Sequence, residues 1–262
     1  MINLARAIQY PFSGDNALTK TMIGALMLLL LPVFFLTGLI LMGYQLRVIR
    51  QVIDGDEDGL PNWGQAGHDL GQGLVVLAGS LLYYFPAIVL AWVGSAIAWE
   101  AISSINVTAL LLEQEGPSFD RETLSIMCLT FALALIWLLL SAPLIMAAIA
   151  HYAETGEFSS FTRILYHADR VWEQRGAAGM LMLNLFLLAI LVQVASAVLS
   201  FICVAGFYLQ FIQFAAICHL NGQWGAHLKA HRPPPEETDP PKPPRQRRRK
   251  KNVIRPIKPP KR

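Results

Sequence analysis

The residues with the clearest potential for chemistry form an acidic turn that reads D-x-D-x-D-G over residues 54–59. A calcium-binding EF-hand loop begins in this way, because alternate carboxylates converge on one cation. The twelfth position of such a loop should be a bidentate glutamate, but here it is Gln65, and Pro61 stands where the loop should pair. We therefore interpret the turn as solvated, with carboxylates that also balance Arg47 and Arg50.

A second set of potential ligands consists of histidines and aspartates in two polar loops, namely His68, Asp69, His151, His167 and Asp169. None has the HxxxH or HExxH spacing of a metal site, so solvated loop side chains are the simpler interpretation. The sequence contains no GxSxG, Walker A, GxGxxG or paired Cys–His motif, and its three cysteines lie in apolar runs. We therefore expect no catalytic residue, no cofactor and no metal, and a protein that is not an enzyme.

The composition indicates which elements must hold these residues. The chain has 262 residues, of which 54% are hydrophobic and 15% are charged, with a mean hydropathy of +0.44. A soluble domain carries about 25% charged residues. The low charge and high hydropathy exclude an ordinary soluble protein and favour one that faces lipid.

Four long apolar runs predict an all-α, polytopic helical membrane protein with about five transmembrane helices. The first three cover 21–46, 73–99 and 124–150. The fourth, 177–220, would form a helix of about 66 Å, twice the thickness of a bilayer core. It must therefore fold back near Cys203–Gly206, which gives spans over roughly 179–201 and 205–222. Pro32 is expected to bend the first span.

Amphipathic interfacial segments are expected between the spans. Residues 2–10 are predicted to form an N-terminal interfacial helix within a lead-in of residues 1–20, and residues 101–112 are apolar but too short to cross. The loop 151–175 carries an apolar stripe with helical spacing, which is predicted to lie on the membrane. The stripe consists of Phe158, Phe161, Ile164, Leu165, Ala168, Val171 and Trp172.

Residues 43–63, GYQLRVIRQVIDGDEDGLPNW, form the most distinctive stretch. We interpret it as an elbow at the membrane surface that joins the first two spans and orients the acidic turn. Its characteristic residues are Gly43, Tyr44, Arg47, Arg50, Gly55, Leu60, Pro61 and Trp63. The second cytoplasmic loop has a similar order, with Gly156 followed by Phe158–Phe161 where the elbow has Gly55 followed by Leu60–Trp63. This suggests two parallel span–elbow–span repeats, although a shared need for aromatic interfacial anchors would explain the same pattern.

The distribution of lysine and arginine predicts the orientation, because short basic loops favour the cytoplasm. The acidic loop after the second span is assigned outside, and the elbow, the loop 151–175 and the C-terminal tail inside. Five spans with an internal tail place the N-terminus outside. A re-entrant first run, broken at Pro32, would place it inside, and both alternatives stay open.

The transmembrane domain is expected over residues 21–228, followed by a disordered, proline-rich tail over 229–262. The tail holds 13 basic and three acidic residues, whereas residues 1–228 hold eight basic and 15 acidic ones. Basic clusters beside a membrane bind anionic lipid head groups, and nucleic acid or an acidic protein is the less favoured partner. The candidate head-group ligands are Arg245, Arg247, Arg248, Arg249, Lys250 and Lys251.

The chain resembles the DUF4013 family of prokaryotic integral membrane proteins. The resemblance is carried by the elbow, Tyr10-Pro11, Gly73, the HYAETGEFSSF loop at 151–161, Phe207-Tyr208 and Leu220–Gln223, and extends over roughly residues 1–228. It implies a multi-pass protein of a prokaryotic plasma membrane and no assigned activity.

Three functions are consistent with these features. The first is a non-catalytic membrane organiser or accessory protein that binds lipids or a membrane protein partner, because the spans lack charged residues and the surface elbows are large. The second is a small-solute or lipid transporter, because Pro32, Pro86 and Pro143 could break helices around a midplane site. The third is a membrane-embedded enzyme.

Overall fold

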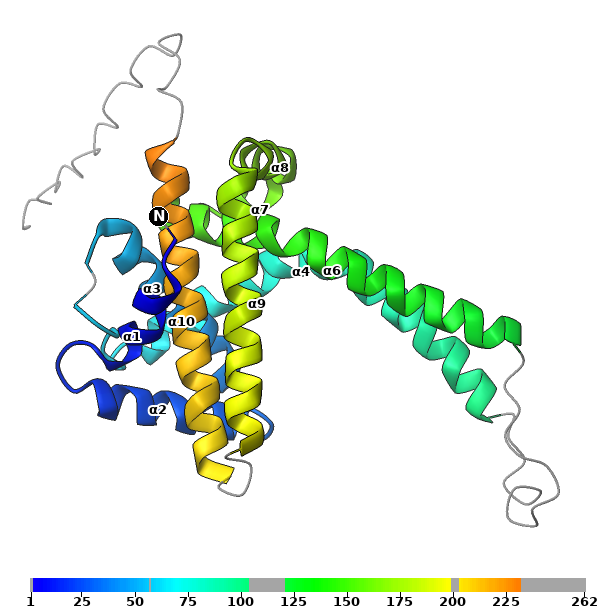
Figure 1. Ribbon diagram of the computed structural model, residues 1–262, viewed down its shortest axis with the longest axis horizontal. Helices are drawn as coiled ribbons and strands as arrows, with labels where there is room; N and C mark the ends of the chain where they lie inside the picture. The colour runs from blue at the N-terminus through cyan, green and yellow to red at the C-terminus, as the bar shows by residue number, and fades with distance from the viewer. Residues whose placement is uncertain (1, 57, 104–120, 199–202, 232–262) are drawn as a thin grey trace, which may run out of the picture. The chain divides into compact units, whose positions relative to one another are not determined.

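The computed structural model describes residues 2–56, 58–103, 121–198 and 203–231, which are all-helical with short connections. Residues 1–231 form one compact unit (Figure 1). Its elements are α1 Leu4–Gln9, η1 Tyr10–Phe12, α2 Ala17–Leu30, α3 Phe35–Asp54, α4 Ala66–Ser103, α6 Arg121–Thr155, α7 Ser159–Thr162, α8 Ile164–Glu173, α9 Arg175–Val198 and α10 Cys203–Ala230. The predicted segment 101–112 falls largely outside the described residues.

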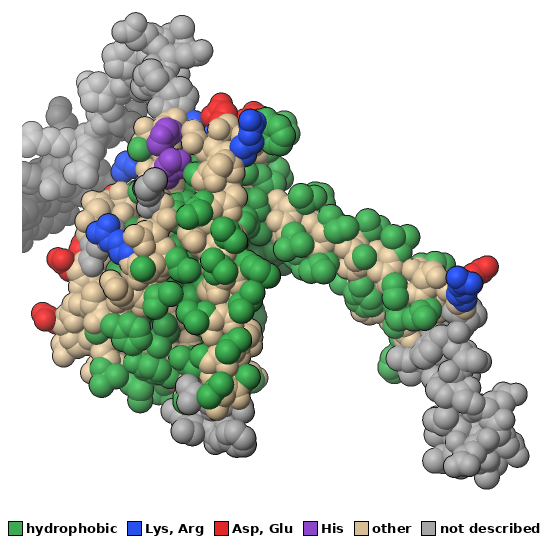
Figure 2. Space-filling model, viewed as in Figure 1, with side chains coloured by type: hydrophobic (Ala, Val, Ile, Leu, Met, Phe, Trp, Pro, Cys, Tyr) green, Lys and Arg blue, Asp and Glu red, His purple; other side chains and the backbone are tan. Residues whose placement is uncertain are grey.

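Three of the described helices are long and apolar enough to cross a membrane: Ala66–Trp99, Arg121–Thr155 and Arg175–Val198. At most 39% of the most apolar window of each is buried inside the protein. Figure 2 shows the remainder as apolar side chains over much of the visible surface of α4 and α6. So much exposed hydrocarbon is unfavourable in water, so the length and composition of these three helices suggest a membrane location, as expected from the sequence.

The first apolar run, residues 21–46, is interrupted at Pro32, where the sequence predicts a bend or a break. The structure ends α2 at Leu30 and begins α3 at Phe35, with Pro32 in the break. Proline lacks the N–H that continues a helix and clashes with the preceding turn. The 14 residues of α2 reach only about 21 Å, which is less than a bilayer core.

The long fourth apolar run forms two helices, as its length requires. Helix α9 ends at Val198 and α10 begins at Cys203, so the reversal falls at residues 199–202, slightly before the predicted turn. Figure 1 shows α9 and α10 side by side. Helix α10 continues to Ala230, so the first two residues of the expected tail are helical.

Glycines set the close crossing of α3 and α4. A methyl group on Gly43 would overlap the carbonyl oxygen of Asp69, and one on Gly73 would overlap the carbonyl oxygen of Leu39. The two backbones are therefore in contact at two points, one at Gly43 of α3 and the other at Gly73 of α4. Small residues permit this approach between helices in lipid, where packing rather than the hydrophobic effect drives association.

The C-terminal ends of α3, α6 and α10 meet at one end of the helical unit. The Arg50 Nε donates to the carbonyl oxygen of Ala153 at 2.9 Å, which joins α3 to the end of α6. The Lys229 Nζ lies 3.8 Å from Asp54 Oδ1, which joins the end of α10 to the end of α3. The elbow, the loop after α6 and the start of the tail therefore share one end.

The N-terminal segment packs against α10 near the same end. The backbone N–H of Asn3 donates to Gln223 Oε1 at 2.6 Å, and the rings of Tyr10 and His219 are 4.6 Å apart. Ile2 and Ala7 are buried. The N-terminal helix is therefore present as predicted, but part of its apolar surface faces protein rather than lipid.

Candidate functional site

The elbow begins where α3 stops. Gly55 adopts a φ of +80°, and its N–H reaches back to the carbonyl oxygens of Gln51 and Val52. A left-handed glycine ends a helix in this way at no steric cost. The chain then returns through residues 58–65 to the start of α4, as predicted for the connection between two long helices.

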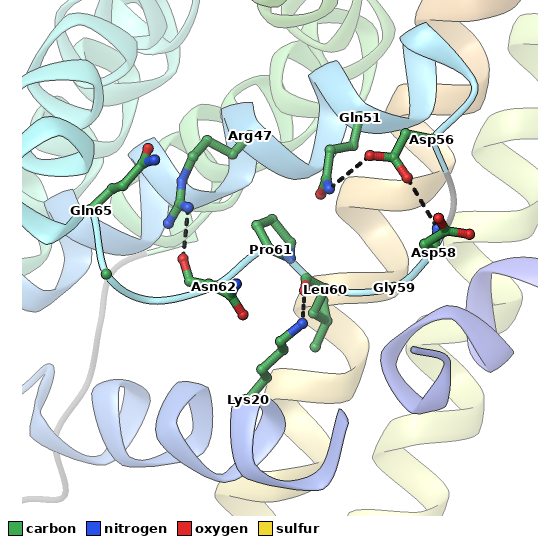
Figure 3. Close-up of a pocket in the computed structure, with 11 residues that line it drawn as sticks. Lys20, Arg47, Gln51, Asp56, Asp58, Gly59, Leu60, Pro61, Asn62 and Gln65 are labelled. Carbon is green, nitrogen blue, oxygen red and sulfur yellow. Dashed lines mark hydrogen bonds between the residues drawn. The ribbon is translucent and has the colours of Figure 1, made fainter. Parts of the chain in front are cut away.

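Four consecutive carbonyl groups of the returning chain each accept a hydrogen bond from a side chain of a different part of the sequence. The pairs are Tyr10 Oη to Gly59 (2.9 Å), Lys20 Nζ to Leu60 (2.6 Å), Tyr44 Oη to Pro61 (3.0 Å) and Arg47 Nη1 to Asn62 (2.7 Å). Figure 3 shows the Lys20 and Arg47 bonds. Since buried carbonyls must be paired, these donors fix the path of the loop onto η1, α2 and α3.

Aromatic stacking holds the end of the loop. The rings of Tyr44 and Trp63 are parallel within 7°, with centroids 4.0 Å apart, and the Trp63 Nε1 donates to the carbonyl oxygen of Lys20 at 2.9 Å. The Arg47 guanidinium lies 5.1 Å from the centroid of the Tyr44 ring. One packed unit therefore contains the four characteristic elbow residues Tyr44, Arg47, Pro61 and Trp63 and accounts for their spacing in the sequence.

Asp69 is the carboxylate that balances Arg47, and the expectation that the acidic turn would do so was wrong. Asp69 Oδ2 lies 2.5 Å from Arg47 Nη2, and the Asp69 side chain is fully buried. Arg50 serves instead as a donor to the end of α6. The sequence suggests Asp69 only as a potential metal ligand beside His68, and no spacing motif links it to Arg47.

A polar cavity of about 540 Å³ opens between the elbow loop and helices α2 and α3 (Figure 3). Lys20 and Arg47 bring positive charge to its lining, and Asp56 and Asp58 bring negative charge. The remaining lining residues are Gln51, Gly59, Leu60, Pro61, Asn62, Gly64 and Gln65. Lys20 was not predicted as a site residue, because a single lysine before an apolar run has no motif of its own.

The histidines and aspartates considered as potential ligands lie in separate places in the structure. Asp56 accepts from the Gln51 side chain and from the backbone N–H of Asp58, so the acidic turn forms bonds with itself and with α3. The rings of His151 and His167 are 5.5 Å apart, and His167 Nε2 lies 2.7 Å from the carbonyl oxygen of Ser160. Across the described ranges, no three His, Cys, Asp or Glu residues are grouped as metal ligands.

The second elbow shares its turn geometry with the first. Gly156 has a φ of +69° and ends α6, as Gly55 ends α3. Phe161 is fully buried, and a methyl group on Gly79 of α4 would overlap its ring. Phe161 is therefore a core residue, in contrast to its predicted place on a lipid-facing stripe. The additional helix α8 has no counterpart after the first elbow.

The six candidate head-group ligands between Arg245 and Lys251 lie outside the described residues. The structure does describe where the tail starts. Arg170 Nη2 donates to the carbonyl oxygen of Leu228 at 2.8 Å, so the last turn of α10 is attached to α8.

A family model described as a protein of unknown function (DUF4013) matches residues 25–207, which is more than half of the chain. The match contains the elbow and the loop 151–161, whereas Tyr10-Pro11 and Leu220–Gln223, which the sequence resemblance included, lie outside it. No curated protein and no solved structure compared with the chain matches it. The chain therefore belongs to the DUF4013 family.

Proposed function

We propose that this chain is a non-catalytic integral membrane protein that organises lipids or a membrane protein partner at one face of a prokaryotic plasma membrane. The charged groups of the elbow support this role, because Arg47 and Arg50 hold a carboxylate and backbone carbonyls rather than an open reaction site. The proposal also assigns the shared end of α3, α6 and α10 to the cytoplasm, with the basic tail.

The inverted polarity of α8 is the observation that carries the proposal. Its His167 and Arg170 side chains are buried against the protein, whereas Leu165 is 80% exposed and Trp172 is 71% exposed. At about 100° per residue, Leu165 and Trp172 lie within about 20° of each other on the helix surface. A water-facing helix would bury these apolar residues, so this face of α8 suits contact with lipid.

The connections at the shared end support an even number of crossings. The N-terminal segment and the end of α10 lie close together, so the chain enters and leaves the membrane from the same side. The three long apolar helices α4, α6 and α9 then need a fourth span, and we assign it to α10, which is less apolar but reaches about 42 Å with its 28 residues. The pair α2–α3, broken around Pro32, is then a re-entrant hairpin. This arrangement takes the re-entrant alternative in place of five spans and puts the N-terminus inside.

The basic tail is proposed to bind anionic lipid head groups. It begins directly after α10, whose last turn is bonded to the interfacial helix α8. Each lysine or arginine near an anionic surface contributes about 1 kcal/mol, so the cluster from Arg245 to Lys251 would hold the tail on the bilayer. Nucleic acid is the less favoured ligand.

The transporter alternative has less support. Helices α4 and α6 continue without interruption through Pro86 and Pro143, and only Pro32 lies at a break between helices. Discontinuous helices are the usual basis of a midplane substrate site. A membrane-embedded enzyme stays the third candidate.

The depth of α8 in the bilayer tests the proposal. The full-length protein, with its native cysteines replaced by alanine, carries the single substitution Leu165→Cys. A nitroxide label is attached to this cysteine, and the labelled protein is reconstituted in vesicles. The matched control is Glu157→Cys, an exposed polar position in the loop before α7 and outside the apolar face of α8. We expect oxygen to relax the label at 165 more than a water-soluble nickel complex does, and the reverse at 157. Equal, nickel-dominated relaxation at both positions would refute an interfacial α8.

A further inference from the structure

The elbow cavity presents separated charges of both signs. Lys20 and Arg47 reach it from α2 and α3, and the exposed Asp56 and Asp58 reach it from the acidic turn. No ion pair joins Lys20 to either carboxylate within the described part of the chain. Arg47 is ion-paired with the buried Asp69, which does not line the cavity, whereas Lys20, Asp56 and Asp58 form no ion pair with one another among the described residues.

Two atoms of the lining lack hydrogen-bond partners among the described residues. They are the Arg47 Nε, a donor, and the Gln51 Oε1, an acceptor, and both are buried. Lys20 has one acceptor, the carbonyl oxygen of Leu60, although an ammonium group carries three donors. The two buried atoms have almost no surface that a ligand could reach, whereas the Lys20 ammonium lines the cavity with donors to spare, so a ligand that supplies an acceptor would bind it.

We infer that the elbow cavity binds a phosphoethanolamine group, with its phosphate toward Lys20 and Arg47 and its ammonium toward Asp56 and Asp58. A ligand with charges of one sign only would leave either the Lys20 ammonium or the two carboxylates without a partner, so a ligand that carries both an anionic and a cationic group fits best. The cavity volume of about 540 Å³ lies in the range of small-molecule sites.

A primary ammonium suits the acidic side of the cavity better than a quaternary one. The exposed carboxylates of Asp56 and Asp58 are acceptors. A primary ammonium donates hydrogen bonds to such groups, whereas a trimethylammonium has no donor. The ligand is either the head group of an aminophospholipid or soluble phosphoethanolamine. The inference rests on the proposed function only in assuming that the elbow reaches the head-group region.

Lipid selectivity of the detergent-purified full chain tests the inference by native mass spectrometry. Equal amounts of phosphatidylethanolamine, phosphatidylcholine and phosphatidylglycerol are offered together. We expect phosphatidylethanolamine adducts to dominate. The variant Asp56→Asn/Asp58→Asn should lower the ratio of ethanolamine to choline adducts roughly tenfold. Lys20→Gln keeps a donor for Leu60 and should lower both adducts. The control Asp54→Asn, an exposed carboxylate outside the lining, should change neither.

A second measurement identifies the source of the ligand. If lipid adducts show no selectivity but soluble phosphoethanolamine raises the thermal midpoint of the wild type and not of Asp56→Asn/Asp58→Asn, the cavity takes the free compound. Absence of both effects, or an equal loss with Asp54→Asn, overturns the inference. Because the nitroxide measurement on α8 does not involve the cavity, that test can succeed while this one fails.

Discussion

Replacing Arg47 with methionine should destabilise the protein more than any exposed substitution in the elbow. The change removes the partner of Asp69, whose side chain has no exposed surface, together with the hydrogen bond to the Asn62 carbonyl. Breaking a buried ion pair on one side costs about 3–5 kcal/mol, because the remaining charge is left without compensation. Loss of the cation–π contact with Tyr44 adds a smaller term of about 0.5–1 kcal/mol.

The double variant Arg47→Met/Asp69→Leu separates the lost pair from the stranded charge. An apolar pair of similar volume is often as stable as the buried ion pair it replaces. We therefore expect the double variant to recover at least about 2 kcal/mol of the loss caused by Arg47→Met alone. The free energies come from reversible unfolding of the detergent-solubilised protein in mixed micelles with increasing denaturing detergent. A single-variant loss below about 1 kcal/mol, or a double variant less stable than Arg47→Met, would refute the role assigned to Asp69.

Two further predictions concern packing and protonation. Gly73→Ala should weaken or prevent the α3–α4 crossing, because its methyl group would overlap the Leu39 carbonyl. In the control Gly71→Ala the methyl group meets nothing within 4 Å, so the stability should stay unchanged or rise by up to about 1 kcal/mol. Equal unfolding midpoints for the two variants would contradict the crossing. Burial lowers the pKa of His167 below its ordinary value of 6.5, so below pH 6.5 the unfolded chain binds more protons and the folded state should lose stability as pH falls. Unfolding measured from pH 7.5 to 5 should show a shallower decline for His167→Gln, and identical slopes would contradict the assignment.

Helix positions followed closely from the sequence where hydrophobicity alone decides them. The apolar runs behind α4, α6 and α9 are long and nearly free of charge, so their length and number could be predicted without knowledge of packing. The reversal between α9 and α10 followed from the same argument, since one helix of that length exceeds any bilayer. The break around Pro32 was harder to predict, because proline is tolerated within membrane helices, as α4 and α6 show at Pro86 and Pro143.

The candidate site was predicted in part. The sequence pattern identified Tyr44, Arg47, Pro61 and Trp63 as one elbow, and the structure brings them into contact. Asp69 could not be assigned to Arg47 from spacing, because their pairing depends on how α4 crosses α3 at the glycine contacts. The inward orientation of Phe161 depends likewise on its contact with Gly79. Tertiary contacts of this kind leave no periodic signal in one sequence.

The sidedness of four positions tests the central claim most directly, namely that the N-terminal segment, both elbows and the tail share one membrane face. The full-length protein, with its native cysteines replaced by alanine, receives one new cysteine at a time, at Ser13, Asp56, Glu157 or Asn252. Cells that contain each variant are treated with a membrane-impermeant maleimide, before and after permeabilisation. The account predicts that all four react only after permeabilisation, while a cysteine at Ser118 reacts in intact cells. Labelling of Ser13→Cys from outside would contradict the even number of crossings, and free labelling of all five in the soluble fraction would contradict the membrane account itself.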